Sequence, residues 1–206
     1  MNKAVKIIGG LFLLGIAVQV IKGTQNGSPT SNSSTSSKSS AQATAPQPAI
    51  PLPEDQVKFL QIVKKAQDAN RAAANDMQKG GARATREKEI CAMLPQLAIS
   101  NWIGEVYTIT SNSDGKGVIE LTLAPNVYVK TWSNALSDTL HHTMIQPGTR
   151  LFEKASQFKE GQQVKFSGSF VGDDAEGCLY ESSLTLDGKL SQPEFIFRFD
   201  EIAALK

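Results

Sequence analysis

With 206 residues, the chain is long enough for one globular domain with appendages, and its 21 Lys/Arg and 20 Asp/Glu leave a net charge of +1. The charges are segregated, because residues 1–84 carry 10 basic and 4 acidic side chains whereas residues 85–206 carry 11 and 16. Nucleic-acid affinity comes mainly from cations that neutralise phosphates, so the acidic C-terminal part argues against nucleic-acid binding.

The N-terminus has the pattern of a membrane-directed segment. Lys3 and Lys6 precede an apolar run that ends at Ile21, and residues 4–21 approach the ~20 residues needed to span a bilayer. No small-residue cleavage site and no cysteine follow the run, so residues 1–23 are predicted to be an uncleaved anchor. A cleaved signal peptide is the alternative. The lysines place the N-terminus in the cytoplasm, which predicts a single-pass protein of the inner (cytoplasmic) membrane with its C-terminal domain in the periplasm or outside the cell.

Residues 24–53 have the composition of a linker. They consist mostly of Ser, Thr, Asn, Gln, Ala and Pro, with Lys38 as the one charged side chain. Such a segment cannot bury enough apolar surface to offset the entropy of ordering, and it is predicted to be disordered. Thirty flexible residues give an r.m.s. reach of roughly 30 Å.

Residues 54–99 are predicted to form a helical neck. Glu54 and Asp55 follow Pro53, where acidic residues favour a helix N-terminus. Apolar residues then recur at about three-residue spacing: Val57, Leu60, Val63 beside Ile62, and Ala66. The helix is expected to run to about Lys79 and to end at Gly80-Gly81. A second helix, over 84–94, would bury Ile90, Cys91 and Leu94. We interpret both as packing elements for the following domain, with a partner-binding surface as the alternative.

Beyond residue 100 the apolar period changes from 3.6 to 2, which is typical of strands. Segment 111–117 contains Asp114-Gly115 and is predicted to be a hairpin turn. A short helix is expected near 151–158. The predicted strands are 102–109, the segment with Ile119, Leu121 and Leu123, 127–132, 164–170, about 179–186, and a final strand in which Phe195, Phe197 and Phe199 face inward.

This order of three strands, a helical connection and two strands resembles that of the OB-fold, a five-stranded Greek-key barrel. The segment 102–106 looks like the first OB strand, in which Gly104 allows strong bending. Residues 159–168 resemble the fourth OB strand, with Gly161, Val164 and Gly168 at the spacing that is usual in that strand's motif. Residues 100–202 thus resemble the tRNA-anticodon-binding-like OB domain of uncharacterised bacterial membrane-anchored or periplasmic proteins.

The resemblance implies a mainly β fold with a helical N-terminal neck (α+β). The barrel domain would occupy residues 100–206, and the Phe-rich segment would be an extra C-terminal strand covering a barrel edge. This barrel hosts many unrelated functions, so the resemblance does not specify a ligand.

Two cysteines, Cys91 and Cys178, are both expected outside the cytoplasm. An even count in an oxidising compartment favours a disulfide, which would fasten the neck to the barrel. The alternative is two buried small side chains without a bond.

No residue pattern points to catalysis, a metal ion or a cofactor. The adjacent His141 and His142 point to opposite sides of an extended chain and rarely chelate one ion. Asp173, Asp174 and Glu176 lack the glycine-punctuated Ca²⁺ loop and are interpreted as a polar turn. The chain is therefore not expected to be an enzyme.

The best ligand-binding candidates lie at the end of the third strand and just after it, because OB-folds bind ligands on strands two and three and in adjoining loops. They are Tyr128, Lys130, Trp132, Asn134 and Asp138. Packing of Trp132 in the barrel mouth is the alternative. The sequence favours a binding module for a protein, peptide or glycan partner. Alternatives are an envelope enzyme or stress factor with an unrecognised site, and a single-strand nucleic-acid binder.

Overall fold

The computed structural model describes residues 50–173 and 177–205. The predicted anchor over 4–21 and nearly all of the predicted linker lie outside them. Among the described residues, no helix is both long and apolar enough to cross a membrane.

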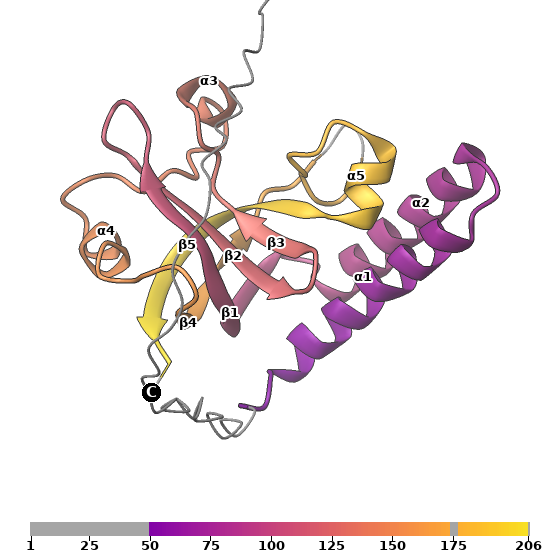
Figure 1. Cartoon of the computed structure of the whole chain (residues 1–206), viewed down its shortest axis with the longest axis horizontal. Helices are drawn as coiled ribbons and strands as arrows, with labels where there is room; N and C mark the ends of the chain where they lie inside the picture. Colours follow the sequence, from indigo (N-terminus) through magenta and orange to yellow (C-terminus); the bar gives the residue numbers. More distant parts are fainter. Residues whose placement is uncertain (1–49, 174–176, 206) are drawn as a thin grey trace, which may run out of the picture. The chain divides into compact units, whose positions relative to one another are not determined.

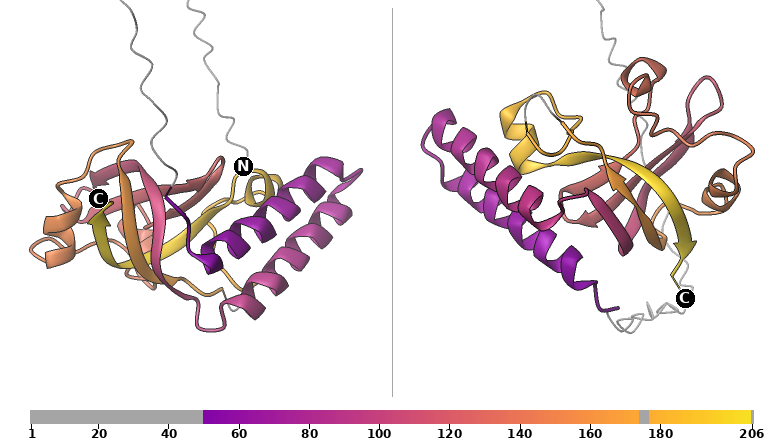
Figure 2. Two further views of the ribbon diagram at one scale, coloured as in Figure 1. Left: turned by 90° about the horizontal axis from the view of Figure 1, so that it is seen from below. Right: turned by 180° about the vertical axis from the view of Figure 1, so that it is seen from behind.

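Two long helices, α1 (Glu54–Ala72) and α2 (Asp76–Met93), form an antiparallel hairpin beside the barrel (Figure 1). The strands are β1 (Ala98–Ser111), β2 (Gly117–Ala124), β3 (Val127–Lys130), β4 (Gln163–Phe170) and β5 (Glu194–Ala204). Three short helices lie in the connections: α3 (Ala135–Asp138), α4 (Arg150–Ala155) and α5 (Leu186–Ser191). Helix α5 packs against the hairpin (Figure 2).

The sheet closes into a five-stranded barrel in the order β1-β2-β3-β5-β4, which is compatible with an OB-like fold. Strand β1 pairs with β4 through its first half and with β2 through its second, and Glu105 takes part in both ladders. Gly104 lies at this crossing. A Cβ there would come within 3.3 Å of both the Leu121 Cβ and the Thr122 carbonyl oxygen, so the absence of a side chain lets β2 pack closely where β1 passes from one ladder to the other.

The Phe-rich segment is the fifth barrel strand, not an addition to it. Strand β5 runs parallel to β3 and antiparallel to β4, and the side chains of Phe195, Phe197 and Phe199 are buried as predicted. The expectation of a strand over 179–186 is wrong, because this segment makes only isolated bridges at Leu179 and Glu181. Thr185 then caps α5 by accepting the Gly188 N–H at 3.0 Å, which turns the chain into a helix.

Two further boundaries differ from the prediction. Helix α1 ends at Ala72, and α2 runs through Gly80-Gly81. The Asn75 side chain accepts the Gln78 N–H at 3.1 Å, and the Gln78 side chain accepts the Ala74 N–H at 2.7 Å. This reciprocal cap starts α2 before the glycines. Strand β3 stops short of Trp132, whose N–H is bonded to the Thr143 hydroxyl at 2.8 Å instead of a neighbouring strand.

The neck and the barrel share one hydrophobic core. Phe59 of α1 lies 5.1 Å from Trp102 and 5.3 Å from Phe195, measured between ring centroids. Gln56 of α1 is buried and bonds to both backbone groups of Ile103, at 2.5 and 2.9 Å. The neck is thus an integral part of the barrel's packing.

Candidate ligand-binding site

Three aromatic rings meet at one end of the barrel, where two long connections come together. Trp132 and His141 belong to the β3–β4 connection, and Tyr180 belongs to the β4–β5 connection (residues 171–193). The Tyr180 ring centroid lies 5.8 Å from that of Trp132 and 4.9 Å from that of His141. The sequence did not predict Tyr180, because residues 179–186 were interpreted as a regular strand.

A cavity of about 600 Å³ opens beside these rings. We call it the Trp132 cleft; its walls include Trp132, Ser137, Tyr180, Glu181, Ser183 and Leu184. The volume is within the range of small-ligand and peptide-anchor pockets. The cleft mixes aromatic, hydroxyl and carboxylate groups, which suits a partner with both polar and apolar parts.

Of the five residues predicted to bind a ligand, Trp132 lines this cleft. Tyr128 is buried and its ring packs on Tyr107, with centroids 5.2 Å apart. The Lys130 ammonium lies 3.1 Å from the carboxylates of both Glu120 and Glu194. Burial lowers the pKa of Lys130, but these two carboxylates outweigh it and raise the pKa above its ordinary value. Lys130 of β3 is therefore linked by ion pairs to β2 and to β5.

The other two predicted residues shape the β3–β4 connection. The Asn134 side chain accepts the Ser137 N–H at 2.9 Å and caps α3. Asp138 is buried, and its carboxylate accepts the N–H and hydroxyl of Thr143 and the N–H of Met144. These bonds hold the connection that carries Trp132 and His141.

Two buried polar atoms at the cleft have no hydrogen-bond partner among residues 50–173 and 177–205: the Trp132 Nε1 donor and the Glu181 Oε1 acceptor. A buried polar group without a partner costs about 1–3 kcal/mol.

Behind the cleft wall lies a buried charge cluster contributed largely by the neck. The Arg86 Nη2 donates to Glu87 Oε1 at 2.7 Å and to Glu181 Oε2 at 2.6 Å, and its Nη1 donates to the Lys189 carbonyl at 2.5 Å. Burial raises the pKa of Glu181 to about 7, although the Arg86 guanidinium opposes the rise. Sequence patterns gave no sign of this cluster, since Arg86 and Glu87 resemble any charged pair on a helix surface.

Three leucines on the connections that border the cleft are almost fully exposed. Leu184 is 97% exposed on the β4–β5 side, while Leu136 and Leu140 are 87% and 84% exposed on the β3–β4 side. Single exposed leucines are common, but three on two adjoining connections are typical of a surface that a partner covers.

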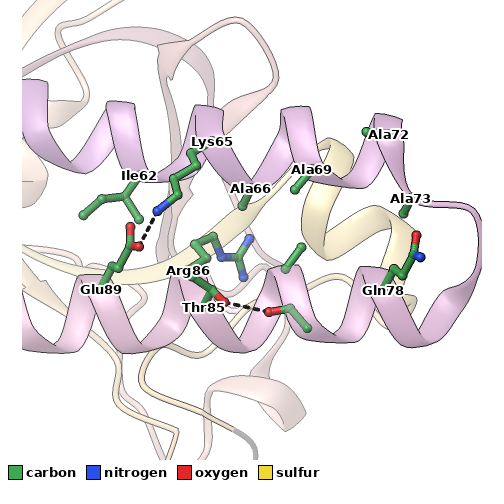
Figure 3. Close-up of a pocket in the computed structure, with 12 residues that line it drawn as sticks. Ile62, Lys65, Ala66, Ala69, Ala72, Ala73, Gln78, Thr85, Arg86 and Glu89 are labelled. Carbon is green, nitrogen blue, oxygen red and sulfur yellow. Dashed lines mark hydrogen bonds and ion pairs between the residues drawn. The ribbon is translucent and has the colours of Figure 1, made fainter.

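A second hollow, of about 420 Å³, lies between α1 and α2 (Figure 3). Small side chains, among them Ala66, Ala69 and Ala73, line it. Lys65 and Glu89 bridge the two helices at a distance of 2.5 Å. Because these side chains are short, they leave part of the space between the two helices unfilled, and this accounts for the hollow.

No group of three or more His, Cys, Asp or Glu side chains within the described ranges is placed to hold a metal ion. His141 packs on Tyr180, and Asp174 and Glu176 lie outside the described residues. Comparison of the chain with protein families, with curated proteins and with solved structures gives no match.

Proposed function

We propose that this protein is a membrane-tethered, extracytoplasmic binding module that catalyses no reaction and takes a peptide segment of a protein partner in the Trp132 cleft. Residues 4–21 would be the anchor and residues 24–53 the flexible linker. As part of this proposal, the barrel is a tRNA-anticodon-binding-like OB domain of the kind found in bacterial membrane-anchored or periplasmic proteins.

The observation that carries the proposal is an aromatic cleft whose wall includes the exposed Leu184, together with two more exposed leucines on the connection that carries Trp132. Leu136, Leu140 and Leu184 offer apolar surface to a partner, and Trp132 and Tyr180 supply the residue types that dominate binding energy at protein interfaces. Removing a leucine side chain of this kind from water on binding contributes about 1.5–3 kcal/mol.

A peptide fits the polar groups as well. Its backbone offers both carbonyl acceptors and N–H donors, which suit the hydroxyl groups of Ser137 and Ser183 in the cleft wall. A glycan also offers both hydrogen-bond types and stacks on aromatic rings, but it has no apolar side chains to cover the leucines. The leucines therefore favour a peptide over a glycan.

The alternatives receive less support. A single-strand nucleic-acid binder needs a basic groove with stacking aromatics, whereas residues 85–206 carry 16 acidic against 11 basic side chains. An envelope enzyme or stress factor would need reactive groups in contact with its substrate. Glu181 is the cleft carboxylate with a raised pKa, but its Oε2 already accepts a hydrogen bond from Arg86. This carboxylate therefore serves as a structural partner of the Arg86 guanidinium.

We expect Leu184→Ser to weaken binding of peptides that the protein selects from a random library by about tenfold or more. The side chain is 97% exposed, so the substitution removes apolar contact with the ligand and leaves the fold intact. Titration calorimetry on the full-length chain measures the affinity, and circular dichroism measures the melting temperature.

Met77→Ser is the matched control, because Met77 is 89% exposed but lies in α2. It should leave both the affinity and the melting temperature unchanged. Selection of glycans in place of peptides, or equal affinities for the Leu184 and Met77 variants, would contradict the peptide-binding cleft.

We expect the tethered protein to fractionate with membranes and to keep its N-terminus, because the run to Ile21 has no small-residue cleavage site after it. Intact-mass spectrometry of the membrane fraction tests this. A mature chain that begins at a residue between 23 and 45 would show instead that the segment is a removed signal peptide.

A further inference from the structure

We infer that Glu87 of the neck is a positioning residue for the Trp132 cleft, which it shapes by holding the β4–β5 connection. This inference rests on the proposed binding function. Glu87 does not line the cleft; it acts through the backbone of Cys178 and Leu179.

The contact is made by the side-chain oxygens of Glu87. Glu87 is buried, and its Oε2 accepts the N–H of Cys178 at 3.0 Å and the N–H of Leu179 at 3.2 Å. Its Oε1 accepts from Arg86 Nη2 at 2.7 Å. A Cβ on Gly177 would lie 3.0 Å from Oε2, so the chain passes directly over this oxygen.

The residues that follow this contact form the cleft wall. Tyr180 and Glu181 come directly after Leu179, and the Glu181 carboxylate is bonded to Arg86 of the same helix. The Cys91–Cys178 disulfide also ties residue 178 to α2, so the Glu87 bonds set the position of the backbone that leaves this bond at Leu179. A shift there moves the Tyr180 ring relative to Trp132, from which it is separated by 5.8 Å between centroids.

The neck also holds the other end of the wall. Asp187 accepts from Asn70 at 3.3 Å and from Lys79 at 3.4 Å, and Gln67 donates to the Ser191 carbonyl at 3.2 Å. Between these two points of attachment lies segment 182–185, which includes the almost fully exposed Leu184. Both ends of the segment are thus fixed by the helical hairpin, which makes the neck part of the binding site.

The test compares Glu87→Ala with Glu87→Gln in the full-length chain. Alanine leaves two N–H groups without their acceptor, whereas glutamine keeps one side-chain oxygen that accepts them. We expect Glu87→Ala to accelerate amide exchange of Cys178 and Leu179 and to lower the affinity for the library-selected peptide, each by about tenfold or more. Glu87→Gln should keep the affinity within about threefold of the wild-type value.

Glu89→Gln is the control, since Glu89 lies on the same helix and pairs with Lys65 between α1 and α2. It should leave exchange at Cys178 and Leu179 and peptide affinity unchanged. If Glu87→Ala does not fold, Gly177→Ala replaces it, because its Cβ displaces the Glu87 carboxylate without removing it; the same losses are then expected.

Unchanged exchange at Cys178 and Leu179 would overturn the inference. Faster exchange with unchanged peptide affinity would also overturn it, by showing a purely structural contact. Failure of the proposed function gives a different result, because affinity for the selected peptide would then be insensitive to Leu184→Ser. The exchange measurement uses no ligand, so it would still report whether Glu87 holds the cleft wall.

Discussion

Replacing Arg86 with methionine is expected to lower the free energy of unfolding by about 3–5 kcal/mol at neutral pH, because it leaves buried carboxylates without their partner. The Arg86 side chain has no exposed surface. It bridges Glu87 and Glu181 and lies over the Phe195 ring at 5.4 Å. Methionine fills much of the volume but supplies no hydrogen-bond donor. Chemical denaturation followed by circular dichroism measures the loss.

The size of the Arg86→Met effect should depend on pH. Burial raises the folded-state pKa of Glu181 from its ordinary value of 4.5 to about 7, so the folded chain retains a proton there that the unfolded chain releases. The Glu181 contribution to stability is therefore lost as pH rises from about 4.5 to about 7. Without Arg86, ionised Glu181 has lost its nearest cation. The penalty should accordingly be smaller at about pH 5.5 than at about pH 8.

Two comparisons isolate the cause of the Arg86 effect. Arg71→Met removes an exposed arginine that pairs with Asp68 on the other neck helix, and it should leave stability nearly unchanged. Adding Glu181→Gln to Arg86→Met should recover part of the loss, because it removes one unpaired carboxylate. A loss for Arg86→Met that is independent of pH, or equal to that of Arg71→Met, would contradict the account.

Loss of the disulfide is the second large effect. Cys91 and Cys178 are bonded, with Cα atoms 5.8 Å apart and a sequence separation of 87. In the chain-entropy model, closing a loop of this length raises the free energy of the unfolded chain by about 4–5 kcal/mol, because the unfolded chain loses conformational entropy. The Cys91→Ser/Cys178→Ser variant should lose up to this amount of unfolding free energy.

The shared core decides how the reduced protein unfolds. Phe59 packs on Trp102, and Glu87 still accepts the N–H groups of residues 178 and 179 without the bond. We therefore expect one cooperative transition at a lower temperature, and no separate melting of the neck. Calorimetry of the double serine variant and of the wild type with and without reductant measures this. Two resolved transitions, or a melting temperature unaffected by reductant, would contradict it.

The helix α1 shows where a sequence pattern reaches its limit. Spacing of three residues predicted a buried face through Val57, Leu60, Val63 and Ala66. Val63 and Ala66 are buried as predicted, but Val57 is exposed, Leu60 is only partly buried, and the unpredicted Phe59 is fully buried. A helix has 3.6 residues per turn, so a face continued at three-residue steps drifts around the axis. Several apolar faces were available, and contact with Trp102 and Phe195 selected one of them.

The sequence by itself predicted the barrel strands and the two-helix neck before them, and it favoured a bond between Cys91 and Cys178. The barrel itself was what the resemblance to the OB-fold implied, and the structure shows that it is closed. Period-2 alternation, the glycine at the bend of β1 and an even cysteine count are local or compositional signals. These signals can be interpreted without knowing which residues are in contact in the fold, because they depend only on local chain geometry and composition.

Only the tertiary structure decided where a ligand could bind. Of the predicted binding residues, Lys130 is paired with carboxylates of two other strands, and Trp132 meets Tyr180 and Glu181 across a cleft. Arg86 and Glu87 are ordinary helix charges in the sequence and become buried, paired groups when the β4–β5 connection folds over them. The environment of a charged or aromatic side chain is set by residues distant in the chain. Its role is therefore fixed by long-range packing, which local periodicity does not encode.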